Sequence, residues 1–130
     1  MLKKYTKKAT KEDSSKPIRV PTVTVCFTGL RFNVSAITQL LCGFSFVELF
    51  YDEKGAGFGI KLIQYPMKGT SYEIKRYRQG GKVYTARVYC SSFVKKLGFL
   101  SGVAQTDKIY PLKLDKEKSI LMVEFDAYYV

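Results

Sequence analysis

The stretch that most restricts the fold is residues 71–89, in which two β-rich runs flank the pair Gly80-Gly81. Tyrosine, isoleucine, valine and threonine favour strands, and adjacent glycines reach the positive-φ conformations that tight turns require. We therefore expect a β-hairpin. Its runs interleave cations with tyrosines, a composition typical of surfaces that neutralise phosphates and stack on bases. The predicted nucleic-acid-binding residues of this hairpin are Lys75, Arg76, Tyr77, Arg78, Lys82, Tyr84 and Arg87.

The net charge of +11 is concentrated in two segments. Residues 1–20 contain seven lysines and arginines against Glu12 and Asp13, and residues 65–100 contain eight against Glu73. Clustered positive charge speeds encounters with polyanions and gives affinity that does not depend on their sequence. Nucleic acid is thus the favoured partner. The alternative is a protein-interaction or inhibitor module whose basic hairpin covers an acidic site on another protein.

Composition argues against an enzyme and against a metal site. The chain has no histidine, and Cys26, Cys42 and Cys90 are an odd number at distant positions without metal-ligand spacing. We expect these cysteines to be small buried apolar residues in a reducing compartment. The acidic residues of the predicted turns, such as Asp52 and Asp115, are ordinary turn formers. We therefore expect no catalytic residue, metal or cofactor.

No apolar run approaches the roughly 20 residues of a membrane span, and no signal-peptide pattern is present. We expect a soluble cytoplasmic protein. Residues 1–17 are polar and basic, which predicts a flexible arm that either grips phosphates or is solvated without a partner. Residues 18–126 predict one globular domain, and residues 127–130 a C-terminal tail that packs on the core or stays exposed.

Within the domain, hydrophobic alternation and turn residues predict four hairpins, at about 22–34, 47–63, 71–89 and 109–125. Apolar residues at helical spacing predict two short helices, one ending near Gly43 and one closing between Gly98 and Gly102. Asn33 or Ser35 is expected to cap the first helix, and Ser91 or Ser92 the second.

The order hairpin, helix, hairpin occurs twice, over residues of about 18–64 and 71–126. When the segment from Arg31 is written over the segment from Arg87, the arginine, a serine, the apolar helical positions and a Gly-Phe pair coincide with one gap. One unit of about 50 residues can bury little apolar surface alone, so the two units should share a core. The predicted fold is α+β and mostly antiparallel, with two ββαββ units related by a pseudo-twofold axis in one barrel-like domain. Chance similarity of two α/β segments is the alternative.

Three segments together resemble a known family. They are Gly81-Lys82-Val83 with Val88 five residues on, the helix end Leu97-Gly98-Phe99, and a strand such as Gly59 to Tyr65 that follows an acidic turn. They look like the AbrB/MazE-type swapped-hairpin DNA-binding domain, in which two ββαββ units interlock into a small barrel and basic strands and loops bind DNA. The resemblance covers nearly all of residues 18–126, with both units in one chain. It implies a small DNA-binding protein of a regulatory, phage or mobile-element type, with phosphate contacts from Arg76, Arg78, Lys82 and Arg87 and, at the matching position of the first unit, Arg31.

The same elements, cut as four strands between two helices, resemble Whirly-type single-strand binders, whose duplicated ββββα units grip unpaired bases. Interleaved tyrosines and arginines favour this alternative because bases stack on aromatic side chains. Reading a duplex would instead need donors directed into a groove. The sequence leaves duplex and single strand open, and it leaves open whether identical chains associate.

Overall fold

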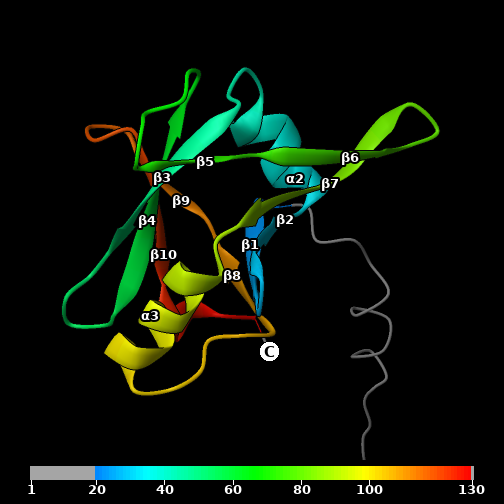
Figure 1. The fold of residues 1–130 in the computed structure, drawn as a ribbon. Coiled ribbons are helices and arrows are strands. Elements are labelled where there is room, and N and C mark those ends of the chain that lie inside the picture. The colour runs from blue at the N-terminus through cyan, green and yellow to red at the C-terminus, as the bar shows by residue number, and fades with distance from the viewer. Residues whose placement is uncertain (1–19, 130) are drawn as a thin grey trace, which may run out of the picture.

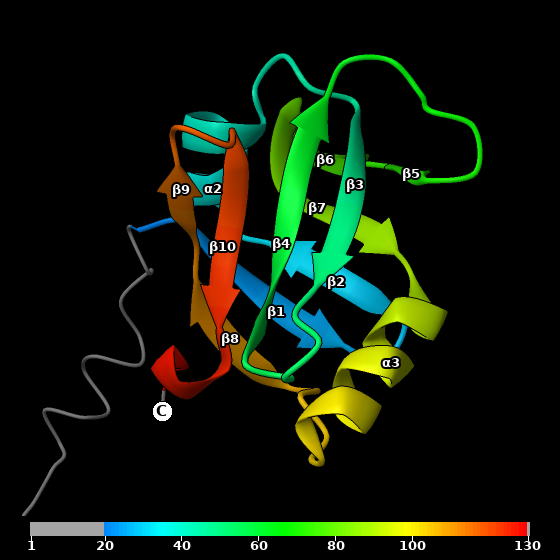
Figure 2. The same cartoon turned by 90° about the vertical axis from the view of Figure 1, so that its left-hand side faces the viewer.

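The computed structural model describes residues 20–129, so the predicted arm and Val130 lie outside the described residues. The strands form two five-stranded antiparallel sheets, which we call sheet A and sheet B (Figure 1). The strand order is β6-β7-β2-β1-β8 in sheet A and β5-β3-β4-β10-β9 in sheet B. The predicted combination of helices with mostly antiparallel strands is confirmed. Figure 2 looks onto sheet B, with strands of sheet A crossing behind it.

Each sheet contains two of the predicted hairpins. Sheet A consists of β1 (Thr22–Cys26), β2 (Gly29–Phe32), β6 (Lys75–Gln79), β7 (Lys82–Tyr89) and β8 (Lys108–Pro111). Sheet B consists of β3 (Phe46–Tyr51), β4 (Gly57–Ile63), β5 (Ser71–Glu73), β9 (Lys113–Asp115) and β10 (Ile120–Glu124). The hairpins β1–β2, β3–β4, β6–β7 and β9–β10 confirm the four predicted turns.

Two stretches predicted as single strands serve both sheets. β5 pairs with β3 in sheet B, and after Ile74 the chain continues as β6 in sheet A. Likewise β8 pairs with β1 in sheet A, and after Leu112 the chain continues as β9 in sheet B. At each crossing the backbone stays hydrogen-bonded, since Ile74 N donates to Ser45 O (2.9 Å) and Leu112 N donates to Pro21 O (3.1 Å). The crossings connect the two sheets along their edges.

Both predicted helices are present, with one predicted cap right and one wrong. α2 (Val34–Ala36) continues directly as the π-helix η1 (Ile37–Leu41), and Asn33 caps it, because its Oδ1 accepts from Ala36 N at 2.9 Å. α3 (Ser91–Ser101) has Cys90 at its N-cap and no side-chain cap, so the prediction of Ser91 or Ser92 is wrong. Cys90 O accepts from Val94 N (3.1 Å), so the helix begins at Ser91 and both serines lie inside its first turn, where they cannot act as the N-cap.

The core lies between the two sheets. Val25, Phe32, Ile60, Tyr110 and Leu121 have essentially no exposed surface. α3 adds Phe93, whose ring meets the ring of Phe58 edge-on at 5.7 Å between centroids. None of the helices in residues 20–129 is long and apolar enough to cross a membrane.

The cysteines differ from the sequence expectation, and the C-terminal tail follows one of its two alternatives. Only Cys90 is buried; Cys26 is half-buried and Cys42 is exposed. The expectation of three buried cysteines is therefore wrong for Cys26 and Cys42. Cys42 is the C-cap residue of η1, where the backbone has already turned to an extended conformation and no longer follows the helix. A short 3-10 helix, η2 (Phe125–Ala127), precedes the tail. Tyr129 N then donates to Ile109 O at 2.7 Å, so the tail packs against β8.

Candidate nucleic-acid interface

The β6–β7 hairpin contains a bulge that changes which side chains share a face. Across the hairpin Tyr77 faces Thr85 and Arg78 faces Val83, so Tyr84 has no partner. An extra residue in one strand shifts the alternation of faces at that point. Tyr84 and Thr85 therefore both reach the face of sheet A that is turned away from sheet B, and both line one hollow there. We call this face the outer face.

Three cations stand in a row on the outer face. Lys75 of β6 is directly opposite Arg87 of β7, and Arg87 is directly opposite Arg31 of β2. Residues paired in this way have Cβ atoms about 4.5–5.5 Å apart, so like charges repel one another. Lys75 Nζ is 3.4 Å from Glu73 Oε1. Within residues 20–129 neither arginine has a carboxylate oxygen within 4.0 Å.

Tyrosines surround the two arginines. A hollow of about 510 Å³ is lined by Arg31, Tyr77, Tyr84, Thr85, Arg87 and Tyr89. Tyr84 and Tyr89 are about half exposed. The hydroxyls of Tyr77 and Tyr89 are 2.6 Å apart, and this hydrogen bond is the main reason that the pKa of Tyr77 is raised above 10.0. The hollow thus offers aromatic rings beside uncompensated positive charge.

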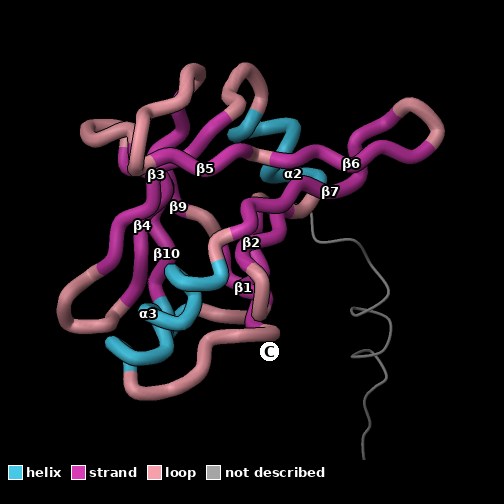
Figure 3. The backbone as a smooth tube through the Cα atoms, in the orientation of Figure 1, coloured by secondary structure: helices cyan, strands magenta, loops and turns pink. Residues whose placement is uncertain are grey.

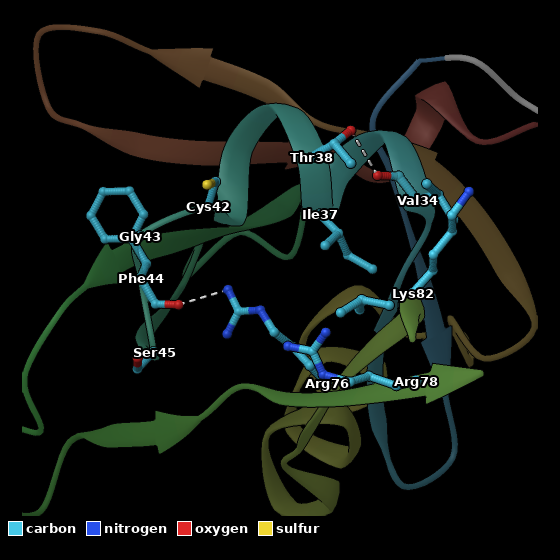
Figure 4. Close-up of a pocket in the computed structure, with 11 residues that line it drawn as sticks. Val34, Ile37, Thr38, Cys42, Gly43, Phe44, Ser45, Arg76, Arg78 and Lys82 are labelled. Atoms are coloured by element: carbon cyan, nitrogen blue, oxygen red, sulfur yellow. Dashed lines mark hydrogen bonds between the residues drawn. The ribbon is translucent and has the colours of Figure 1, made fainter. Parts of the chain in front are cut away.

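Arg76 lies on the other side of the hairpin. It is opposite the buried Ala86, and its Nη2 donates to the carbonyl oxygens of Leu41 and Phe44, both at 2.7 Å. These oxygens belong to the end of η1 and the turn after it. Figure 4 shows the bond to Phe44. Arg76 therefore fastens the hairpin to the first helix.

The predicted site residues divide into two groups. Lys75, Tyr77, Tyr84, Arg87 and Arg31 belong to the outer face. Arg76, Arg78 and Lys82 line a second pocket between the hairpin and the first helix. The predicted set omitted Tyr89, which the structure places in the hollow; its alternation with Thr85 and Arg87 along β7 was the available signal.

Acidic residues outside this surface shape turns. Asp52 Oδ2 accepts from Ala56 N at 3.0 Å, and Asp115 Oδ1 accepts from Lys118 N at 3.3 Å. Residues 20–129 contain no group of three or more Cys, Asp or Glu side chains arranged to hold a metal ion. Comparisons with protein-family models, with curated proteins and with solved structures found no match.

Proposed function

We propose that this protein binds nucleic acid through the outer face of sheet A. The observation on which the proposal depends is the row Lys75, Arg87, Arg31, in which like charges are held side by side. A folded chain gains nothing from this repulsion, whereas a phosphate between the two arginines replaces it with attraction to both. Guanidinium groups also match phosphate oxygens with paired hydrogen bonds.

The tyrosines favour a single strand as the ligand. Tyr84 and Tyr89 present rings beside the arginines, and stacking of an unpaired base on such a ring contributes about 1–3 kcal/mol. In a duplex the bases are already stacked and paired, so these rings would have no partner. We therefore take single-stranded DNA or RNA as the ligand class, with phosphates at Arg31 and Arg87.

Duplex DNA is a second candidate, supported by the shape of the β6–β7 hairpin. Its tip, turning at Gly80 and Gly81, projects beyond the two sheets (Figure 3). A two-stranded ribbon fits the major groove. Arg78 and Lys82 flank the tip and would meet phosphates or base edges there.

We also propose that residues 18–64 and 71–126 are two copies of one ββαββ unit around a pseudo-twofold axis, as the AbrB/MazE-type resemblance implies. Corresponding strands pair antiparallel at the centre of each sheet, β2 with β7 and β4 with β10. Arg31 faces Arg87, its counterpart in the sequence repeat. The crossings of β5–β6 and β8–β9 between the sheets support a barrel-like closure. On this proposal Arg31 and Arg87 occupy the same position in the two units and lie opposite each other across the pseudo-twofold axis.

The test is fluorescence-anisotropy titration of a labelled single strand and its duplex, each at several salt concentrations. The double variant Arg31→Gln, Arg87→Gln should bind the single strand at least about tenfold more weakly. Its salt slope should flatten by about 1.4, because two phosphate contacts are lost. Tyr84→Leu should weaken the single strand and spare the duplex. Thermal unfolding should show the double variant to be at least as stable as the wild type, because the repulsion is gone.

The matched control is Lys54→Gln with Lys118→Gln, which removes the same charge from exposed turns of sheet B. It should change affinity far less than the arginine variant. Equal losses of affinity in the two double variants would show that the outer face contributes only general electrostatic attraction. Absence of binding to either nucleic acid at low salt would refute the proposal and favour an acidic protein partner. Stronger binding to the duplex that depends on Arg78 and Lys82 would favour the second candidate.

A further inference from the structure

A second pocket lies on the opposite side of the β6–β7 hairpin from the outer face. It opens between the hairpin and the helix formed by α2 and η1, and its volume is about 760 Å³ (Figure 4). This volume is in the range of sites that hold small molecules. Segments more than thirty residues apart in the chain meet here, and Arg76 holds them together through its bonds to Leu41 O and Phe44 O.

The pocket walls are largely apolar. Val34 and Ile37 come from the helix, and Val83 comes from the hairpin. Val34, the first residue of α2, is 49% exposed. Because the three side chains line the same pocket, a flat apolar group between the helix and the hairpin would be covered from two sides.

Positive charge borders the same space. Arg76, Arg78 and Lys82 line the pocket, and no acidic residue does. Within residues 20–129 none of the three has a carboxylate oxygen within 4.0 Å. Figure 4 shows Arg76 and Arg78 extending from the hairpin strand into the space below Ile37. Since two backbone carbonyls fix the guanidinium of Arg76, part of the charge is already oriented before a ligand arrives.

We propose that this pocket binds a single nucleotide, with its phosphate at Arg78 and Lys82 and its ring against Val34, Ile37 and Val83. A phosphomonoester bears a charge of about −1.5 to −2, which suits several cations better than the single charge of a carboxylate. A flat ring between the apolar walls would also lie beside the fixed guanidinium plane of Arg76, on which rings stack, whereas an alkyl chain would leave that plane without a partner. A free nucleotide and the terminal nucleotide of a bound strand offer this same chemistry. The first source is independent of the proposed function, and the second rests on it.

The experiment is a titration of the isotope-labelled full chain, followed by amide NMR shifts, with adenosine 5′-monophosphate, adenosine and inorganic phosphate as separate probes. We expect the nucleotide to shift the amides of Val34, Ile37 and Val83. Its affinity should exceed that of either part by at least about tenfold, because ring and phosphate bind together. Phosphate binding as tight as the nucleotide, or shifts confined to Tyr84 and Tyr89, would overturn the proposal.

Two variants test the two halves of the pocket. Arg78→Gln should weaken the nucleotide and phosphate alike, and Val34→Ser should weaken the nucleotide and leave phosphate unchanged. The side chains of Val34 and Arg78 are both exposed, so we expect both variants to fold like the wild type. Lys118→Gln, in the exposed β9–β10 turn of sheet B, is the control and should leave nucleotide affinity unchanged. If Arg78→Gln and Val34→Ser bind the nucleotide like the wild type, the pocket is not its site.

A competition experiment distinguishes a free nucleotide from the terminal nucleotide of a bound strand as the ligand of the pocket. Displacement of the bound nucleotide by a 5′-phosphorylated single strand, but not by the 5′-hydroxyl strand, would assign the pocket to a strand terminus. Retention of the nucleotide in the presence of either strand would assign it to a free nucleotide. The variant Arg31→Gln, Arg87→Gln should lose strand affinity and keep the nucleotide-induced amide shifts of Val34, Ile37 and Val83. Failure of this proposal and failure of the proposed function therefore give different results.

Discussion

Arg76 and Arg78 lie two residues apart on the same strand, yet they have different roles in the folded chain. Arg76 and Arg78 both belong to β6 and both line the second pocket. Arg76 satisfies two backbone carbonyls at the end of the first helix, whereas no hydrogen bond of Arg78 is found within residues 20–129. At the residue scale, Arg76 is thus a structural cation and Arg78 a cation available to a ligand.

Arg76→Ala should therefore lower the free energy of unfolding by about 1.5–3 kcal/mol, because it removes charge-assisted hydrogen bonds and leaves two carbonyls without their donor. Arg78→Ala, its neighbour on the same strand, should stay within about 0.5 kcal/mol of the wild type. Urea denaturation followed by circular dichroism measures both. Equal stability of the two variants would show that the bonds of Arg76 contribute nothing to the fold.

Tyr110 predicts a loss of stability at alkaline pH. Its side chain is fully buried and its hydroxyl donates to Gln105 Oε1, and burial raises its pKa from 10.0 to about 12. The folded protein therefore holds the phenol proton more tightly than the unfolded chain does. This contribution is complete below pH 10 and is lost as the pH rises toward about 12.

The measurement is the free energy of unfolding of the wild type and of Tyr110→Phe as a function of pH. The stability advantage of the wild type should shrink between pH 10 and about 12, by on the order of 2–3 kcal/mol. A difference between the two proteins that stays constant over this range would contradict the assignment.

At the scale of elements, the spacing between β2 and β7 holds the two arginines of the outer face opposite each other. Gly29 and Tyr89 are paired at one end of this contact. A Cβ atom at Gly29 would lie 1.9 Å from the carbonyl oxygen of Val88. Only glycine therefore permits the two backbones to come this close.

Gly29→Ala should push β2 and β7 apart, destabilise the fold by about 1–3 kcal/mol and weaken binding to single strands. Gly98→Ala is the control, because a Cβ there would meet nothing closer than 3.6 Å and alanine is the better helix former. It should raise stability by up to about 1 kcal/mol. Thermal unfolding and anisotropy titration measure both effects. A Gly29→Ala variant as stable as Gly98→Ala would show that the close approach is dispensable.

At the scale of the whole molecule, the two sheets arrange their charges differently. In sheet A three cations stand side by side, whereas in sheet B Lys113 Nζ is 2.8 Å from Glu124 Oε1 and Lys61 is directly opposite Glu48. Residues 1–17 add six lysines against two acidic residues. Since phosphate contacts set the salt dependence of binding, this segment should strengthen attachment without adding sequence preference.

Deletion of residues 1–17 should weaken binding to every nucleic acid by a similar factor and flatten the salt slope by up to about 4 for single strands. The unfolding temperature should change little. The control replaces residues 1–17 with a neutral segment of equal length. A deletion that leaves the salt slope unaltered would remove the segment from the interface.

The sequence by itself determined the elements of this protein. Glycine pairs and acidic turns specified the hairpins, Asn33 specified the start of the first helix, and the interleaved cations and tyrosines indicated one region of the chain. These signals are local, because turn geometry and capping depend on neighbouring residues. The tertiary structure decided the rest. A one-residue bulge brought Tyr84 to the outer face, the carbonyl oxygens of Leu41 and Phe44 engaged the guanidinium of Arg76, and the pairing of β2 with β7 set Arg31 beside Arg87. Each of these outcomes depends on how one segment pairs with or packs against another, and a pattern read along one strand does not contain that information.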